Sequence, residues 1–298
     1  MKKQWKTIII ILAVLFVASW LVSSILSVFT QAEPRGNVAV IPVKGMITAD
    51  SGSYLSTVAT SSSKVRGFIE KAEDDSAVKA MIIEINSPGG SAVASEEIAR
   101  AIQKTNKTTV AWIRESGTSG AYWIAASTDH VISSGMSLVG SVGVLSSTLG
   151  FSEFLSDYNI TYRRVVGGEY KDIASPLKNM TLEEKSILQQ KVNLIHAQFL
   201  DEIVSLRNLS NKAENEIGSG LFYTGTEAKE LGLVDELGNK PEVIKYLEQE
   251  LNTSIKTKTY HKEKTFIQTL SQLMSEQSYF LGRGIGTFLN SNDVLITT

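Results

Sequence analysis

The sequence predicts an α/β domain with mainly parallel strands, and three observations support this fold class. The nearly continuous apolar run VKAMIIEI (78–85) is typical of a strand covered on both faces, and NSPGGS and a helical pattern follow it. The strand-like TTVAWI (108–113) is followed in the same way by a small-residue helix, AYWIAAS. A long amphipathic helix then begins after Thr181. Strands that alternate with helices favour a parallel sheet, because a parallel crossover needs a helix-sized connection.

The remaining elements follow from local composition. NVAVIPV (37–43), bounded by glycines, predicts a buried strand, and the Ser-, Thr- and Gly-rich residues 51–63 predict a loop. Further short strands are expected at HVISS (130–134), VGVL (142–145) and ITYRRVV (160–166).

The long helix has a start signal and an apolar stripe. Thr181 and Glu184 form a capping box. Apolar residues recur at helical spacing at Leu188, Val192, Ile195, Phe199 and Ile203. The tail beyond residue 262 fits either a short amphipathic helix or an extended end.

An apolar segment near the N-terminus indicates a membrane anchor. Residues 8–29 carry no charge and follow Lys2, Lys3 and Lys6. At about 1.5 Å per residue this stretch spans a hydrocarbon core of about 30 Å. The preceding lysines place the N-terminus in the cytoplasm and the remainder outside. A cleaved signal peptide is the alternative, but signal cores run only about 7–15 residues, which favours an uncleaved anchor.

These features divide the chain into five parts. We expect a cytoplasmic N-terminus, a transmembrane anchor, a polar linker, one folded domain and a C-terminal extension, at residues 1–7, 8–29, 30–36, 37–260 and 261–298.

Composition excludes several classes of function. The formal net charge is −2 and no dense Lys/Arg stripe occurs, so nucleic acid is not an expected partner. The chain has no cysteine, which excludes disulfides, thiolate metal sites and cysteine nucleophiles. Its three histidines are too scattered for a recognisable zinc motif. We therefore expect neither a metal nor a cofactor.

The segment RESGTSGAYWIAAS contains a candidate nucleophile, Ser119, at a predicted strand-to-helix turn. Ala121 stands where the α/β-hydrolase pattern G-x-S-x-G requires its second glycine, so that pattern fails. A Ser–His–Asp triad would need a histidine in a catalytic loop. We interpret all three histidines as surface or hydrogen-bonded residues: His130, His196 and His261.

A serine can also use a lysine amine as its base. The pKa of that lysine must fall from about 10.4 towards neutrality, which burial away from carboxylates can achieve. The best candidate is Lys171, in the Gly-, Ser- and Pro-rich turn GGEYKDIASPLKNMT. Most loop lysines are solvated, and Asp172 would oppose a lowered pKa if its side chain pointed the same way.

Two glycine-containing turns offer supporting groups. In NSPGGS, Gly89 and Gly90 would let backbone N–H groups approach a ligand closely, as an oxyanion hole requires, although Gly-Gly is also ordinary in a strand-to-helix turn. No Lys-Ser/Thr pair follows, so a phosphate loop is not expected. Ser141, in GSVG, is a rival nucleophile.

In this order, the motifs resemble those of the signal peptide peptidase A family. They are INSPGGS, SGTSGAYWIAAS, LVGSVGVL, GGEYKDIASPLKNMTLEE and FYTGTEAKELGLVDELG, and the resemblance as a whole covers roughly residues 37–238. The family consists of membrane-anchored serine proteases related in fold to the Clp protease subunit and crotonase. The resemblance implies that residues 37–260 form a serine protease domain of that fold, in the short, single-domain form.

The resemblance assigns a role to each candidate. Ser119 is the nucleophile, Lys171 is the general base, and Ser141 helps to hold the lysine amine. The oxyanion hole would use the N–H of Gly89 or Gly90 together with that of Gly120. At the start of a helix, Ser119 would also lie at the positive end of the helix dipole.

This chain departs from the family pattern at two small residues. Thr118 replaces the usual alanine and Ala121 replaces the second glycine. These changes affect the expected shape of the pocket more than its chemistry.

The family implies a substrate class and an assembly. Cleaved signal peptides and other unfolded or apolar peptides would be hydrolysed outside the cytoplasm, at the cell membrane. In short-form relatives the serine and the lysine come from neighbouring subunits of a ring, so we expect a homo-oligomer, an octamer, with shared sites.

Two alternatives stay open. One is a membrane serine protease of the same fold that acts on another membrane protein. The other is a non-catalytic, crotonase-like scaffold that binds peptides. A crotonase-type acyl-CoA enzyme would explain neither the anchor nor the lysine.

Overall fold

The computed structural model describes residue 5 and residues 12–20, 36–50 and 59–261. The chain divides into two compact units, Met1–Tyr260 and His261–Thr298, and the first contains every element discussed below. Of the expected anchor, only residues 12–20 are described, and they are helical. No helix in the described ranges is both long enough and apolar enough to span a bilayer. The linker and the C-terminal extension lie outside the described residues, except for Gly36 and His261.

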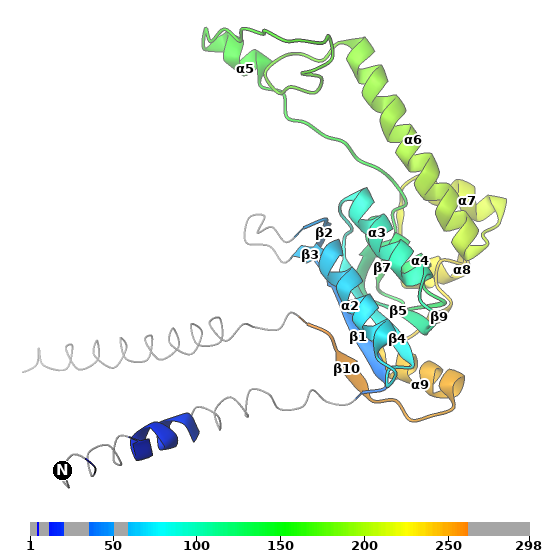
Figure 1. Ribbon diagram of the computed structural model, residues 1–298. Helices are drawn as coiled ribbons and strands as arrows, with labels where there is room; N and C mark the ends of the chain where they lie inside the picture. The colour runs from blue at the N-terminus through cyan, green and yellow to red at the C-terminus, as the bar shows by residue number, and fades with distance from the viewer. Residues whose placement is uncertain (1–4, 6–11, 21–35, 51–58, 262–298) are drawn as a thin grey trace, which may run out of the picture. The chain divides into compact units, whose positions relative to one another are not determined.

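A mainly parallel sheet forms the centre of the domain (Figure 1), as the sequence predicts. In the described part of the chain it has eight strands, six of them in the order β10–β1–β4–β5–β6–β9, all parallel to their neighbours. Their bounds are β1 (Val38–Lys44), β4 (Ala80–Ser87), β5 (Thr108–Thr118), β6 (His130–Ser133), β9 (Glu236–Leu237) and β10 (Thr257–Thr259). The other two are β7 (Leu138–Gly140), parallel to the end of β5, and β8 (Phe222–Thr224), antiparallel to β7.

Helices cover both faces of this sheet, which explains the continuous apolar run of β4. Met81, Ile83 and Ile85 belong to the core under α2 (Ser62–Asp74), α3 (Ala92–Gln103) and α4 (Gly120–Ala126). Ala80 and Ile82 alternate with them and pack on the opposite face, under α9 (Lys240–Leu251). Figure 1 shows α2, α3 and α4 side by side on their face of the sheet. Both sets of side chains are fully buried, as the period of two in a strand requires.

Three local predictions were wrong. The strand expected at 142–145 lies earlier, at β7, because positive φ angles at Gly140 (90°) and Ser141 (51°) turn the chain out of the sheet. Residues 160–166 form no strand: all are exposed and none has a strand partner. The loop expected at 51–63 ends early, since residues 59–61 form β3 (Ala59–Ser61), paired with β2 (Met46–Thr48), and α2 begins at Ser62.

The long helix α6 (Leu182–Arg207) is confirmed, together with the capping box of Thr181 and Glu184. Its apolar stripe is buried only in the second half. Phe199 and Ile203 are buried, whereas Ile195 is 40% exposed. The shorter helices are α5 (Ser152–Asp157), α7 (Asn211–Ile217) and α8 (Gly225–Glu230).

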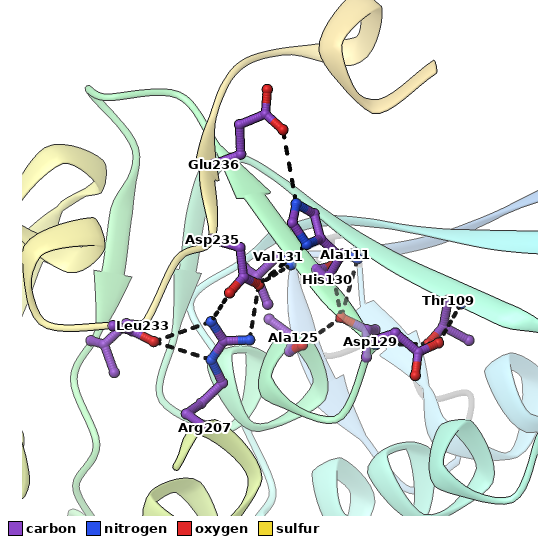
Figure 2. A network of polar contacts seen from close by, with 12 residues as sticks. Thr109, Ala111, Ala125, Asp129, His130, Val131, Arg207, Leu233, Asp235 and Glu236 are labelled. Atoms are coloured by element: carbon purple, nitrogen blue, oxygen red, sulfur yellow. Dashed lines mark hydrogen bonds and ion pairs between the residues drawn. The ribbon is translucent and has the colours of Figure 1, made fainter. Parts of the chain in front are cut away.

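An ion pair fastens the end of α6 to the sheet (Figure 2). Arg207 donates two hydrogen bonds to Asp235, at 2.6 and 3.0 Å, and Asp235 lies just before β9. Partial burial raises the pKa of the Asp235 carboxyl, but Arg207 outweighs burial and holds the net pKa below its ordinary value. The buried Tyr122 of α4 donates to the carbonyl of Leu233, 2.9 Å away, in the same segment. The end of α6 and helix α4, which follows Ser119, are therefore both attached to the segment that leads into β9.

Candidate active site

Ser119 lies at the junction of β5 and α4, where it is the N-cap residue of α4. Its backbone has φ 54° and ψ −131°, a conformation that non-glycine residues rarely adopt and that is typical of functional sites. Its N–H donates to the carbonyl of Gly140, 2.7 Å away, which ties the turn to the end of β7. The Ser119 side chain makes no capping hydrogen bond, so its hydroxyl is not engaged by its own helix. Ser119 is half-buried, so the hydroxyl is held in the fold without being enclosed.

Gly89 packs directly against this turn. Its φ is 97°, and a Cβ atom there would lie only 2.9 Å from both the Gly120 nitrogen and the Ser119 Cβ. The close approach of the two turns therefore requires glycine at this position. The N–H of Gly89 donates to the Ser87 hydroxyl at 3.1 Å, so it is already used inside the NSPGGS turn.

The two residues that flank Gly90 both form hydrogen bonds with Ile47. Ile47 donates its N–H to the carbonyl of Gly89 and accepts the N–H of Ser91, both at 2.9 Å. A Cβ on Gly90 would lie 2.1 Å from the Ile47 oxygen, so only glycine fits. Among the hydrogen bonds of the described residues, none uses the Gly90 N–H.

A cavity of about 370 Å³ joins these groups. Gly90, Ser119 and Gly120 all line it. The rest of the wall is mainly apolar and consists of Ser91, Ala92, Trp123, Gly143, Val144, Leu145, Ile195 and Phe199. The Trp123 and Phe199 rings stack at 4.9 Å between centroids, which joins α4 to α6. A larger groove, of about 550 Å³, runs between α2 and α3 and contains none of the predicted residues.

Ser141 lies beside this site. It follows Gly140, whose carbonyl binds the Ser119 N–H, and it too has a positive φ, of 51°. Its N–H donates to the carbonyl of Leu221 at 2.8 Å, and its hydroxyl donates to that of Gly220 at 3.2 Å. The hydroxyl is thus occupied by a backbone carbonyl, which suits a supporting group better than a nucleophile.

Lys171 is not brought to Ser119 within one chain. It is exposed, it does not line the cavity, and among the described residues no hydrogen bond joins it to Ser119 or Ser141. In the part of the chain that the structure describes, its segment makes hydrogen bonds only to its own neighbours, within residues 151–185. The Phe151 N–H donates to the carbonyl of Pro176 at 2.7 Å, and Tyr170 donates to Glu183 at 2.7 Å. We call residues 145–181 the arm; it leads directly into α6.

Sequence reasoning missed the part of the site that α6 supplies. His196 lies 3.2 Å through Nε2 from the carbonyl of Val142, so it is a hydrogen-bonded histidine, as interpreted, but it borders the site. Ile195 and Phe199 form the cavity wall on either side of it in the sequence. The helical spacing of the apolar stripe identified these residues as a buried face. The sequence contains no signal that this face would turn towards Ser119.

Two protein-family models match this chain. The model of peptidase family S49 matches residues 101–254, which include Ser119, Ser141 and Lys171. The model of the NfeD1b N-terminal domain matches residues 37–151.

Individual proteins and solved structures are also similar to this chain. A Methanocaldococcus jannaschii protein to which protease activity is attributed is 34% identical over 224 residues, which are 74% of this chain and 71% of that protein. An Enterococcus faecium protein to which the name signal peptide peptidase SppA is attributed is 30% identical over 200 residues, 66% of this chain and 58% of that protein. The alignment thus spans less than two thirds of the Enterococcus protein. Among solved structures, ClpP1 from Listeria monocytogenes has a TM-score of 0.45 and 14% identity, over 68% of this chain and 92% of that one. The family match and the archaeal relative confirm the resemblance expected from the motifs: this chain belongs to peptidase family S49.

Proposed function

We propose that this chain is a membrane-anchored serine endopeptidase that hydrolyses cleaved signal peptides and other unfolded or apolar peptides outside the cytoplasm. One observation carries the proposal. Ser119, which has a strained backbone, lines a mainly apolar cavity together with two glycines, Gly90 and Gly120. In a member of a peptidase family, that combination supports acyl transfer.

The reaction starts at the Ser119 hydroxyl. Lys171, as a neutral amine, takes its proton while Oγ bonds to the carbonyl carbon of the scissile peptide. The N–H groups of Gly90 and Gly120 stabilise the oxyanion. Gly90 is favoured over Gly89 because the Gly89 N–H already donates to Ser87.

The intermediate then collapses. The C–N bond breaks, and the leaving amine takes the proton from Lys171, which leaves an acyl ester on Ser119. Water attacks this ester with Lys171 again acting as the base, so both residues return to their starting state. Ser141 is proposed to hold the lysine amine in place.

A second copy of the chain supplies Lys171 in this proposal. Two features support it. Among the described residues the arm makes hydrogen bonds only to residues 151–185, and it carries apolar side chains that are almost fully exposed, among them Leu145 (87%) and Val165 (96%). Exposed apolar surface on this scale marks an interaction site. We propose a homo-oligomer, an octamer, in which the arm of one subunit brings Lys171 to Ser119 of the next.

Residues 8–29 would hold this assembly on the cell membrane. The three preceding lysines support a cytoplasmic N-terminus and an extracytoplasmic protease domain. The apolar walls of the cavity suit the apolar segments that such a protease would meet there.

Covalent labelling tests the proposal directly. The detergent-solubilised full chain is treated with a fluorophosphonate probe and assayed for hydrolysis of an apolar peptide, and mass spectrometry identifies the modified residue. We expect the label on Ser119, and we expect Ser119→Ala and Lys171→Ala each to lower turnover at least 10³-fold with the fold retained. A wild-type protein that neither labels at Ser119 nor cleaves peptides would leave the non-catalytic scaffold as the better interpretation.

A further inference from the structure

The amine proposed as the base has an acidic neighbour in the sequence. Lys171 can lose its proton near neutral pH only if no carboxylate pairs with it, because an opposite charge within about 4–6 Å favours the ammonium form. Asp172 is adjacent to it. In the described part of the chain, however, Lys171 forms no ion pair within 4.0 Å.

The Asp172 carboxylate is already occupied. Arg164 binds both of its oxygens, with Nε 2.6 Å from Oδ2 and Nη2 2.9 Å from Oδ1. The Lys178 amine lies 3.2 Å from Oδ1. The side chain of Asp172 is 13% exposed and that of Arg164 is 37% exposed. The hydrogen bond from Arg164 lowers the pKa of Asp172 to about 2, which keeps the carboxylate charged and attached to its cations.

Two other carboxylates around the turn, Glu183 and Glu184, are engaged as well. Glu183 accepts the Tyr170 hydroxyl at 2.7 Å, which raises the pKa of Tyr170 to about 12. Glu184 binds the Lys178 amine at 2.5 Å and accepts the Thr181 N–H at 3.0 Å. Of the four carboxylates in residues 169–184, Glu169 alone has no side-chain contact among the described residues, and its backbone carbonyl accepts a hydrogen bond from Arg164.

Arg164 therefore connects the residues that precede Lys171 in the turn with those that follow it. It contacts the backbone before the lysine, at Glu169, and the side chain after it, at Asp172. Without Arg164, Asp172 would keep only Lys178 as a paired cation, and the next cation along the chain would be the neighbouring Lys171 amine.

We infer that Arg164 is a positioning residue for catalysis, which withholds Asp172 from Lys171 so that the lysine amine can deprotonate when a second subunit covers it. This rests on the proposed function, since it assumes that Lys171 is the base. Arg164 touches no reacting atom in this account and acts only through Asp172.

The pH profile of Ser119 labelling tests the inference. The rate of fluorophosphonate labelling is measured against pH on the solubilised full-length oligomer, for wild type and four variants. In Arg164→Gln we expect the acidic limb of the profile to move up by about one pH unit, because Asp172, which then keeps only its contact with Lys178, can stabilise the Lys171 ammonium. In Arg164→Gln/Asp172→Asn the limb should return to within about 0.3 unit of wild type, because the carboxylate is gone.

Two further variants make each outcome interpretable. Arg163→Gln is the matched control, since Arg163 makes no hydrogen bond or ion pair among the described residues, and its profile should not move. Lys171→Ala tests the role of Lys171 as the base separately from the role of Arg164. If it labels at the wild-type rate, the proposed base is wrong and the inference falls with it. If Lys171→Ala is inert and Arg164→Gln keeps the wild-type limb, only the role of Arg164 is refuted.

A purely structural role has its own signature. If Arg164→Gln lost activity at every pH and the double variant did not recover, Arg164 would simply support the fold of the turn, which would overturn the inference. Circular dichroism and size-exclusion chromatography on each variant check that the oligomer is intact.

Discussion

Ser119 and Ser141 both have positive φ angles, 54° and 51°, although neither is glycine. Such conformations cost on the order of 1–3 kcal/mol each and persist only where the surrounding structure enforces them. Here the enforcing contacts are hydrogen bonds: Ser119 donates to Gly140, and Ser141 donates to Leu221. The two serines are therefore coupled through one short stretch of backbone at the end of β7.

The turn after β4 contains two candidate oxyanion donors that the sequence alone does not distinguish. Gly89 and Gly90 were equivalent candidates because both follow a buried strand. The difference arises from the contacts of Gly89 with Ser87 and of Gly90 with Ile47. Ile47 is distant in the sequence and Ser87 fits many turn geometries, so neither contact leaves a readable pattern.

The proposed oxyanion donor, the Gly90 N–H, can be tested by adding a single side-chain carbon to Gly90. Gly90→Ala places a Cβ 2.1 Å from the Ile47 oxygen, which forces the donor N–H out of position. We expect peptide turnover to fall by roughly 10²–10³-fold, the usual effect of removing one oxyanion donor. Steady-state hydrolysis by the solubilised oligomer measures this loss.

Gly67→Ala is the matched control. Gly67 lies in α2, and a Cβ there would meet nothing within 4 Å. This variant should keep full activity and gain about 0.5–1 kcal/mol in unfolding free energy, because alanine favours a helix more than glycine does. Equal turnover in the two variants would contradict the role assigned to Gly90.

Helix α6 links the arm to the nucleophile. Its capping box and apolar stripe were predicted from the sequence because they depend on residues within one or two turns of each other. Which part of the stripe would be buried was not predictable, since that depends on partners elsewhere in the fold. Ile203 and Phe199 meet the core, whereas Ile195 remains 40% exposed on the cavity wall.

The wrong strand at 160–166 has a related cause. The segment is rich in β-branched and aromatic residues, which favour strands, and so it carries the local signal. A strand also needs a neighbouring edge, and the described chain offers none to this segment. Local propensity thus favours a strand here, but it does not show whether a neighbouring strand is available for pairing.

His196 supports a prediction at the scale of this helix. Its ring lies 3.2 Å from the carbonyl of Val142, a fully buried residue next to Ser141. His196→Leu leaves that carbonyl without a partner, at a cost of about 1–3 kcal/mol in unfolding free energy. At about 2–4 °C per kcal/mol for a domain of this size, thermal unfolding should begin several degrees lower.

His196→Gln is the conservative comparison, because the Gln amide can still donate a hydrogen bond to that carbonyl. We expect it to recover most of the lost thermal stability and of the peptide-cleaving activity. If the Leu variant melts at the wild-type temperature, the contact with Val142 contributes nothing to the site.

At the scale of the molecule, one chain buries an α/β core and leaves its arm uncovered. Leu182, where the arm joins α6, is 89% exposed, in line with the exposure of Leu145 and Val165. Side chains of this kind are ordinarily covered in a stable assembly. The same arm carries Lys171, so the base that we propose and this exposed apolar surface belong to one segment.

The fold class and the family were predictable from the sequence, because buried strands and short motifs are local features. The assembly was expected only through the resemblance. A pattern within one chain does not specify a contact with a second subunit, because that contact involves no neighbour in the same fold.

Mixing two inactive variants tests the central claim most directly. Ser119→Ala and Lys171→Ala proteins are combined, dissociated and reassembled in detergent, and peptide hydrolysis is compared with that of each variant alone. If sites are shared between subunits, random mixing pairs an intact serine with an intact lysine at roughly a quarter of the sites, so activity should return to about that fraction of wild type. Mixed oligomers that assemble normally and stay as inactive as their parents would contradict the shared site.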